Sequence, residues 1–314
     1  MRFFSRIKNI FFKRKMKLLS DSPNTDKAVE LALKEKNPEK IIDILNNTSN
    51  ILTSNEIATI ISKLPIKKRL EGMIIARKNI NAYDLYELID KKLDNLSKVN
   101  AIKEFQDDLN LYELFGIFNN LSPDRRTEAL EQCIDRFDPS SLGELIESYI
   151  PLSERGDMLY KYDSIIDPFS KTQIIMKMIP DEGVEALKKY CNEINSNNIF
   201  YIINSFPTTY ISDALRFSYK NLNSNQIRNI IMYKVPEEQR LNLLEICSEK
   251  LDIAARTDII KYGISESEIE TAVTAISDYL DVEHVSSIIY GIKLSAKFLK
   301  VLAEKFSLKV ENSK

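Results

Sequence analysis

The sequence contains no tryptophan, only seven glycines and a single histidine. So few glycines leave little material for the tight turns of a many-stranded β fold. The patterns GxxxxGK(S/T), GxGxxG and HExxH, which bind nucleotides or zinc, do not occur. A nucleophile that needs a histidine base would depend on His284, which follows a helix-capping aspartate and is expected on a helix surface. These absences favour an all-α, non-enzymatic protein with no cofactor, no bound metal and no small-molecule substrate.

Cysteine is scarce, and Cys133, Cys191 and Cys247 lie far apart without CxxC spacing. Neither a disulfide framework nor a zinc site is indicated, so a reducing, cytoplasmic compartment is expected. The three cysteines share one position of the repeat described below, where a small side chain packs; the alternative is a redox or metal role. No apolar run approaches the roughly 18 residues of a membrane-spanning helix.

The net charge is −2, but the basic side chains are concentrated at one end. Residues 1–20 hold seven lysines and arginines and no acid, so the remaining residues carry 37 basic and 46 acidic side chains, a net charge of −9. A protein that binds nucleic acid normally presents a basic face to the phosphates. The acidic body therefore makes nucleic acid a less favoured partner than protein.

Residues that start helices recur every 28 or 29 residues. These ten residues, all of types that cap helix N-termini, are Thr25, Thr53, Asn81, Asn110, Asp138, Asp167, Asn195, Asn223, Asp252 and Asp281. The seventh and eighth residues after each cap are apolar, as is typical of the buried side of a helix. Twelve or thirteen residues after the cap, seven of the ten repeats have a proline, which suits the first turn of a second helix.

Each repeat is therefore predicted to be two helices joined by a tight turn. One hairpin cannot bury both its apolar faces, but stacked hairpins share a continuous core. We expect an all-α, right-handed superhelical solenoid of about ten αα-hairpins of 28 to 29 residues. Its predicted bounds are residues 25–309, with a basic amphipathic segment at 1–20, a linker at 21–24 and a C-terminal tail at 310–314.

Three turns share one pattern, an apolar residue followed by Pro-x-x-x-Arg, at residues 64–69, 150–155 and 235–240. These turns resemble those of HEAT and armadillo repeats, and more closely the short helical units of the intracellular N domain of magnesium transporters. The resemblance covers residues 25–309. It implies a helical-repeat architecture and carries over no function or site, because the transmembrane part and nucleotide-binding domains of such a transporter have no counterpart in this sequence.

Four arginines follow the predicted turns at equivalent positions, namely Arg69, Arg126, Arg155 and Arg240. A ladder of guanidinium groups along one face would hold an acidic peptide or a phosphate chain. The alternative is that these arginines solvate the second helix and pair with neighbouring acids. Val184 and Ile211 interrupt the ladder in two repeats.

Residues 1–20 differ from the repeats, because large apolar side chains alternate with basic ones at helical spacing. The residues expected to contact a membrane or a partner are Phe3, Phe4, Arg6, Ile7, Phe11, Phe12, Lys13, Arg14 and Lys15. A basic amphipathic helix of this kind lies well in an anionic membrane interface. Three alternatives are a mitochondrial presequence if the source is a eukaryote, a helix that docks into a partner's groove, and a solvated tail.

Together these features predict a non-enzymatic α-solenoid that binds another macromolecule, a protein, along its extended surface. It would be cytoplasmic and peripheral to a membrane through residues 1–20. The first alternative is a helical-repeat protein that binds nucleic acid, which requires basic residues to converge on one groove. The second is an enzyme with a carboxylate-based site between repeats, which requires a deep pocket with several buried acids.

Overall fold

The computed structural model describes residues 25–290 and 293–306, and within these ranges the chain forms helices and no strand. The all-α prediction is therefore confirmed. The chain divides into two compact units, Met1–Pro151 and Leu152–Lys314. Each unit is described by itself, and the expectation of one repeat domain over 25–309 stays a prediction.

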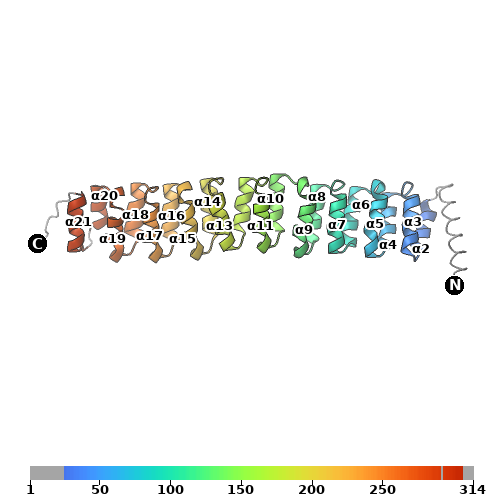
Figure 1. Cartoon of the computed structure of the whole chain (residues 1–314), viewed down its shortest axis with the longest axis horizontal. Helices are drawn as coiled ribbons and strands as arrows, with labels where there is room; N and C mark the ends of the chain where they lie inside the picture. The colour runs from blue at the N-terminus through green and yellow to red at the C-terminus, as the bar shows by residue number, and fades with distance from the viewer. Residues whose placement is uncertain (1–24, 291–292, 307–314) are drawn as a thin grey trace. The chain divides into compact units, whose positions relative to one another are not determined.

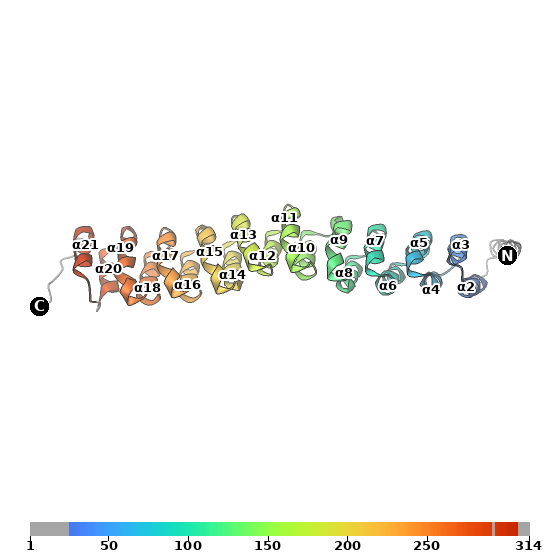
Figure 2. The ribbon, with the colours of Figure 1, turned by 60° about the horizontal axis from the view of Figure 1, so that its bottom comes forward.

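The helices of unit 1 alternate along the chain between two rows, and each row packs side by side (Figures 1 and 2). Row A contains α2 (Thr25–Lys34), α4 (Ser54–Lys63), α6 (Ala82–Lys92), α8 (Leu111–Asn120) and α10 (Pro139–Ser148). Row B contains α3 (Pro38–Thr48), α5 (Ile66–Ala76), α7 (Asn95–Phe105) and α9 (Pro123–Cys133). Neighbours along the sequence therefore pair across the rows, and neighbours within a row belong to successive repeats.

Unit 2 follows the same two-row plan (Figure 2). Its row A contains α12 (Pro168–Met176), α14 (Ser196–Ser205), α16 (Ser224–Tyr233), α18 (Ile253–Gly263) and α20 (Val282–Ile289). Its row B contains α11 (Arg155–Lys161), α13 (Pro180–Tyr190), α15 (Thr208–Ser218), α17 (Glu237–Cys247), α19 (Ile269–Ala275) and α21 (Ala296–Phe306). Contacts between neighbouring helices are compatible with a helical repeat.

The row A helices begin where the sequence predicts. Nine of the ten expected residues, from Thr53 to Asp281, are N-caps whose side chains accept a hydrogen bond from a backbone N–H of the first turn. At α8 the cap is reciprocal, because Asn110 accepts from the N–H of Glu113 at 3.0 Å while the Glu113 carboxylate accepts from the N–H of Asn110 at 2.8 Å. These bonds satisfy donors that have no partner inside the helix.

The turn prolines act at the start of row B helices. Pro38, Pro123 and Pro180 are the first residues of their helices, whereas Pro65 and Pro236 are N-caps. Proline is favourable at these places because its fixed φ suits helix entry and its missing N–H would have had no acceptor.

The core lies between the two rows. The seventh and eighth residues after the caps are buried in almost every row A helix of both units, as Ile60 and Ile61 illustrate with no exposed surface. The clearest exception is Leu33, whose side chain is 38% exposed. Its helix, α2, is the first of the described row and has a row neighbour on one side only.

The three cysteines are buried near the ends of row B helices. Burial raises the pKa of the Cys133 and Cys247 thiols to about 12 and raises that of Cys191 as well. A thiol with a raised pKa is protonated at neutral pH and is a poor nucleophile and a poor metal ligand. Their burial supports the packing interpretation of this repeat position.

Candidate binding face

The predicted arginine ladder bonds to backbone carbonyls of the chain itself. In unit 1, Arg126 lies in the first turn of α9, and its Nε donates to Leu121 O at 3.1 Å and its Nη2 to Asn119 O at 3.2 Å, both at the end of α8. Its Nη1 donates to Tyr149 O, at the end of α10, at 3.1 Å. The planar fork of arginine thus joins the C-terminal ends of two successive row A helices, and we call this arrangement an arginine clamp.

Arg69, two repeats before Arg126, forms the same clamp with the carbonyls of Ser62, Leu64 and Lys92. In unit 2, Arg240 donates through Nε to Val235 O and through Nη1 to Gly263 O, each at 3.0 Å. Arg155 reaches Lys177 O, after the end of α12, at 2.9 Å. The guanidinium groups therefore hold helix ends together, and their contact with a ligand stays a prediction.

Repeats without a clamp arginine fill its position in other ways, of which α7 and α13 are two examples. In α7 the position belongs to Lys98, whose Nζ lies 3.2 Å from Asp90 Oδ1, and each of the two side chains is only 7% exposed. In α13 it belongs to Gly183, four residues after the N-cap Ile179, and not to the adjacent Val184 that the sequence suggests. A Cβ added at Gly183 would lie 2.9 Å from Phe206 Cε1. The ring of Phe206, which caps the end of α14, takes the place of a guanidinium group because Gly183 has no side chain.

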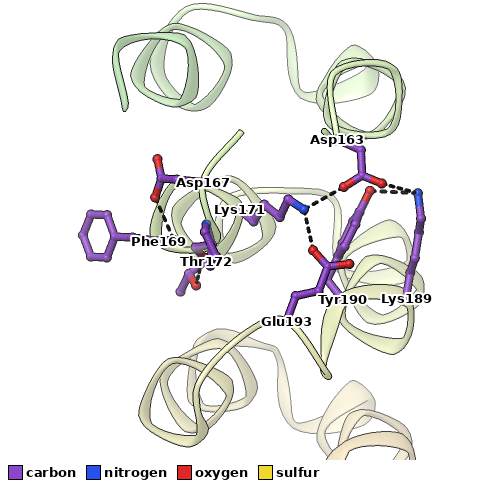
Figure 3. A network of polar contacts seen from close by, with 9 residues as sticks. Asp163, Asp167, Phe169, Lys171, Thr172, Lys189, Tyr190 and Glu193 are labelled. Atoms are coloured by element: carbon purple, nitrogen blue, oxygen red, sulfur yellow. Dashed lines mark hydrogen bonds and ion pairs between the residues drawn. The ribbon is translucent and has the colours of Figure 1, made fainter. Parts of the chain in front are cut away.

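A different repeat position, in row A instead of row B, holds the most buried charged side chain among the described residues of unit 2. Lys171 of α12 is 5% exposed, and its Nζ donates to Asp163 Oδ1 at 2.7 Å and to Glu193 Oε2 at 2.6 Å (Figure 3). The same Nζ lies 4.7 Å from the centre of the Tyr190 ring. Lys189 completes the network with a 2.9 Å bond to Tyr190 Oη and a 3.3 Å ion pair with Asp163.

The network holds its charges fixed and offers no free base. Hydrogen bonds from Lys171 and Lys189 lower the pKa of Asp163, although partial burial opposes this. Burial disfavours the charged form of Lys171, but the bonds to Asp163 and Glu193 outweigh it, so the pKa is raised. Lys171 is therefore protonated at neutral pH and cannot act as a base or nucleophile.

The equivalent residue three repeats later shows what this position does. Arg256 of α18, also four residues after its cap, donates to Ser248 O at 3.0 Å and to Tyr279 O at 2.8 Å. These carbonyls lie at the ends of row B segments, so Arg256 links successive repeats as the clamps do in row A. Lys171 does the same through carboxylates, which indicates a structural role.

Three neighbouring row A helices of unit 2, α12, α14 and α16, carry little charge on their solvent side. Second and sixth residues after the caps of α12, α14 and α16 are Phe169, Gln173, Asn197, Tyr201, Asn225 and Asn229, and we call these six residues the amide–aromatic face. The three helices contain two charged residues, Lys171 and Arg228. Lys171 is buried, and Figure 3 shows it on the opposite side of α12 from Phe169. Arg228 is bound to Asp258 at 2.9 Å.

Aromatic rings stand out from this face. Phe169 is 62% exposed and Tyr201 is 60% exposed, and Tyr233 at the end of α16 is 71% exposed. Asn197, Tyr201 and Asn229 line a groove of about 560 Å³ between α14 and α16, together with one acid, the α18 cap Asp252. Its floor is fixed by Gln226, which donates to Ser196 O at 3.3 Å and to Asn197 Oδ1 at 3.0 Å.

The opposite row of unit 2 has a different surface. Four acids, Asp157, Asp181, Glu182 and Glu185, line a groove of about 420 Å³ between α11 and α13. All but Glu182 are exposed to solvent, and Glu182 is half-buried. This acidic groove thus lies on row B, whereas the solvent side of α12, α14 and α16 has the depletion of charge that marks the centre of a protein interface.

Row A of unit 1 repeats part of this pattern. Tyr83 and Tyr112, each two residues after its cap, are 67% and 86% exposed. The sequence contained a signal for both surfaces, because the second and sixth positions after the caps of α8, α12, α14 and α16 lack charge. The repeat is recognised from its buried positions, whereas these side chains are exposed. An analysis of buried positions therefore does not detect the missing charge.

The predicted membrane or partner segment, Phe3 to Lys15, lies outside the described residues. Within the described part of the chain, no helix combines the length and apolarity needed to cross a bilayer. Nor does that part contain a group of histidine, cysteine or acidic residues placed to hold a metal ion. His284 lies at the start of α20, where its backbone N–H and ring Nδ1 approach Asp281 Oδ1 at 2.8 Å and 2.6 Å.

Comparisons of the chain with models of protein families, with curated proteins and with solved structures gave no match. The function of the candidate binding face is therefore inferred from the chemistry of its residues.

Arg126→Ala is expected to lower the free energy of unfolding by about 2–4 kcal/mol, because three carbonyls at two helix ends lose a charged donor. The adjacent Arg125→Ala is the matched control. Arg125 forms exposed ion pairs with Asp124 and Glu128, so its loss should change stability by less than about 0.5 kcal/mol. Urea unfolding followed by circular dichroism measures both. Equal effects of the two substitutions would contradict the clamp.

Asp163→Asn is expected to reduce stability at pH 7 by about 1–2 kcal/mol, a discounted value because Asp163 is 33% exposed. The lowered pKa of Asp163 means that its ionised form stabilises the fold fully above the ordinary pKa near 4 and loses this effect as pH falls through the folded value. Wild type and variant should therefore converge below about pH 4. Thermal unfolding at pH 3 to 7 measures this, with Asp213→Asn in a surface pair as control. A difference that stays constant with pH would argue against the network.

Proposed function

We propose that this chain is a non-enzymatic α-solenoid of the HEAT or armadillo type, with about ten right-handed hairpins, that binds another protein through its row A surface. The observation that carries the proposal is the amide–aromatic face of unit 2. An exposed aromatic ring gains no free energy from burial in the free protein. It gains that free energy when a partner covers it, so exposed rings mark interaction surfaces. The exposed Tyr83 and Tyr112 give row A of unit 1 a second surface of similar composition.

A protein suits this surface better than a nucleic acid. Nucleic acid would need free cations beside the rings to neutralise phosphates. The cations of α12 and α16 are already bound, Lys171 to two carboxylates and Arg228 to Asp258. Aromatic anchors flanked by amides and free of charge are the usual composition of the centre of a protein interface.

The proposal includes a cytoplasmic location at a membrane surface through residues 1–20. This part rests on composition: seven basic side chains and no acid accompany bulky apolar residues such as Phe11 and Phe12. Each basic residue near an anionic bilayer contributes about 1 kcal/mol of binding. The remaining body, with a net charge of −9, would be repelled by the same surface and is expected to stay above it.

A photo-crosslinking amino acid at Tyr201 or Tyr112 tests the protein-binding face in the native cell. Because both side chains would lie within the interface, each position should give discrete adducts of higher mass. The control is the same amino acid at Glu245, an exposed row B position on α17. Adducts are resolved by gel electrophoresis and identified by mass spectrometry. Adducts from position 245 alone, or from none of the three, would count against the proposal.

Co-sedimentation of the full chain with vesicles containing anionic phosphatidylserine tests the membrane part. Binding is expected, should weaken as salt screens the basic residues, and should fall about tenfold in a Phe11→Glu, Phe12→Glu variant. Vesicles of neutral phosphatidylcholine are the control. If the double variant sediments as well as the wild type, residues 1–20 do not insert.

A further inference from the structure

The amide–aromatic face is a neutral surface on an acidic protein. Outside residues 1–20 the chain has a net charge of −9, so two copies repel each other in most orientations. Helix α14 has no charged residue, and its neighbours α12 and α16 contribute none that is free; the one acid in the groove beside α14 is Asp252, whose carboxylate caps α18. The acids of row B in unit 2 lie on the other row, so two copies that meet through row A keep these acids apart.

The chemistry of the face is self-complementary. When identical surfaces meet about a two-fold axis, a side chain near the axis faces its own copy. Two carboxylates or two ammonium groups repel there, whereas asparagine, glutamine and tyrosine each carry a donor and an acceptor and can bond to a second copy of themselves. Pairs of buried asparagines fix the register of coiled coils in the same way. Asn225 and Tyr201 are exposed and suited to such pairing.

We infer that the amide–aromatic face of unit 2 binds the same face of a second copy of this chain, about a two-fold axis beside α14. The inference rests on the proposed function and names one partner for its binding face. α14 is the middle helix of the three, so an axis beside it brings α12 of one copy over α16 of the other. Tyr201, 60% exposed on α14, is then the aromatic anchor.

The dimensions of the amide–aromatic face limit the area that a contact between two copies can bury. Helices of nine or ten residues are roughly 15 Å long, and three of them side by side span roughly 27 Å. Such a contact falls at the small end of specific interfaces, which bury on the order of 1,000 Å² in total. We therefore expect a weak dimer whose formation depends on protein concentration.

Sedimentation equilibrium of the full chain between 1 and 300 µM is the test. The mass should rise from 36.2 kDa toward twice that value. Tyr201→Glu and Tyr201→Lys should each weaken self-association at least tenfold, because like charges would meet at the axis. An equimolar mixture of the two variants should recover it, because opposite charges then face each other. Phe217→Glu, at a 43% exposed ring of row B, is the matched control and should dimerise as the wild type does.

A wild type that stays monomeric throughout this range would overturn the inference. So would a dimer that Tyr201→Glu leaves unchanged, since the copies would then meet elsewhere, or a mixture of the two variants that fails to associate. The proposed function is judged separately. If the wild type is monomeric while the crosslinker at Tyr201 captures a different protein, the second copy is excluded and the protein-binding face stands. If neither a dimer nor an adduct forms, both fail.

Discussion

The structure depends on satisfying the ends of short helices. A helix of ten or eleven residues leaves four N–H and four C=O groups without partners inside the helix, so more than a third of its backbone polar groups must be satisfied from outside. Side chains of the preceding cap residues accept from the N–H groups, as Asn110 does. Arginines of the following helix donate to the carbonyls. Because Arg126 reaches the ends of both α8 and α10, the same bonds that complete a helix also join it to the next repeat.

This constraint determines where charge is found in the molecule. Arg69, Arg126 and Arg240 are bound to carbonyls, and Lys171 is bound to Asp163 and Glu193. The arginines that the sequence suggests as ligand-binding residues are therefore the ones that join successive repeats. The surface left for another molecule on row A of unit 2 consists of neutral residues whose removal would leave the clamps in place. Stability and recognition are thus assigned to different side chains.

Most of the fold could be predicted from the sequence because its determinants are local and periodic. A cap such as Asn223 and the pair Ile230 and Ile231 are separated by fixed numbers of residues, and helix geometry relates them directly. The partners of the arginines could not be predicted in the same way, because backbone carbonyls have no residue identity and one of them lies 23 residues away. The boundary between the units also leaves no mark, since Pro151 occupies the same place in its repeat as the other turn prolines.

Gly183 and Phe206 limit how the repeats of this protein can be exchanged. Repeats that contact only their neighbours are commonly regarded as interchangeable modules that duplication can multiply. Here the ring of Phe206 uses the space above Gly183 that a clamp arginine would fill, and the two residues belong to successive repeats. A copy of the repeat that carries Arg240, inserted before Phe206, would bring a guanidinium group and a ring to one place. Gene duplication at this junction would therefore have to be accompanied by a change of the arginine or of the ring.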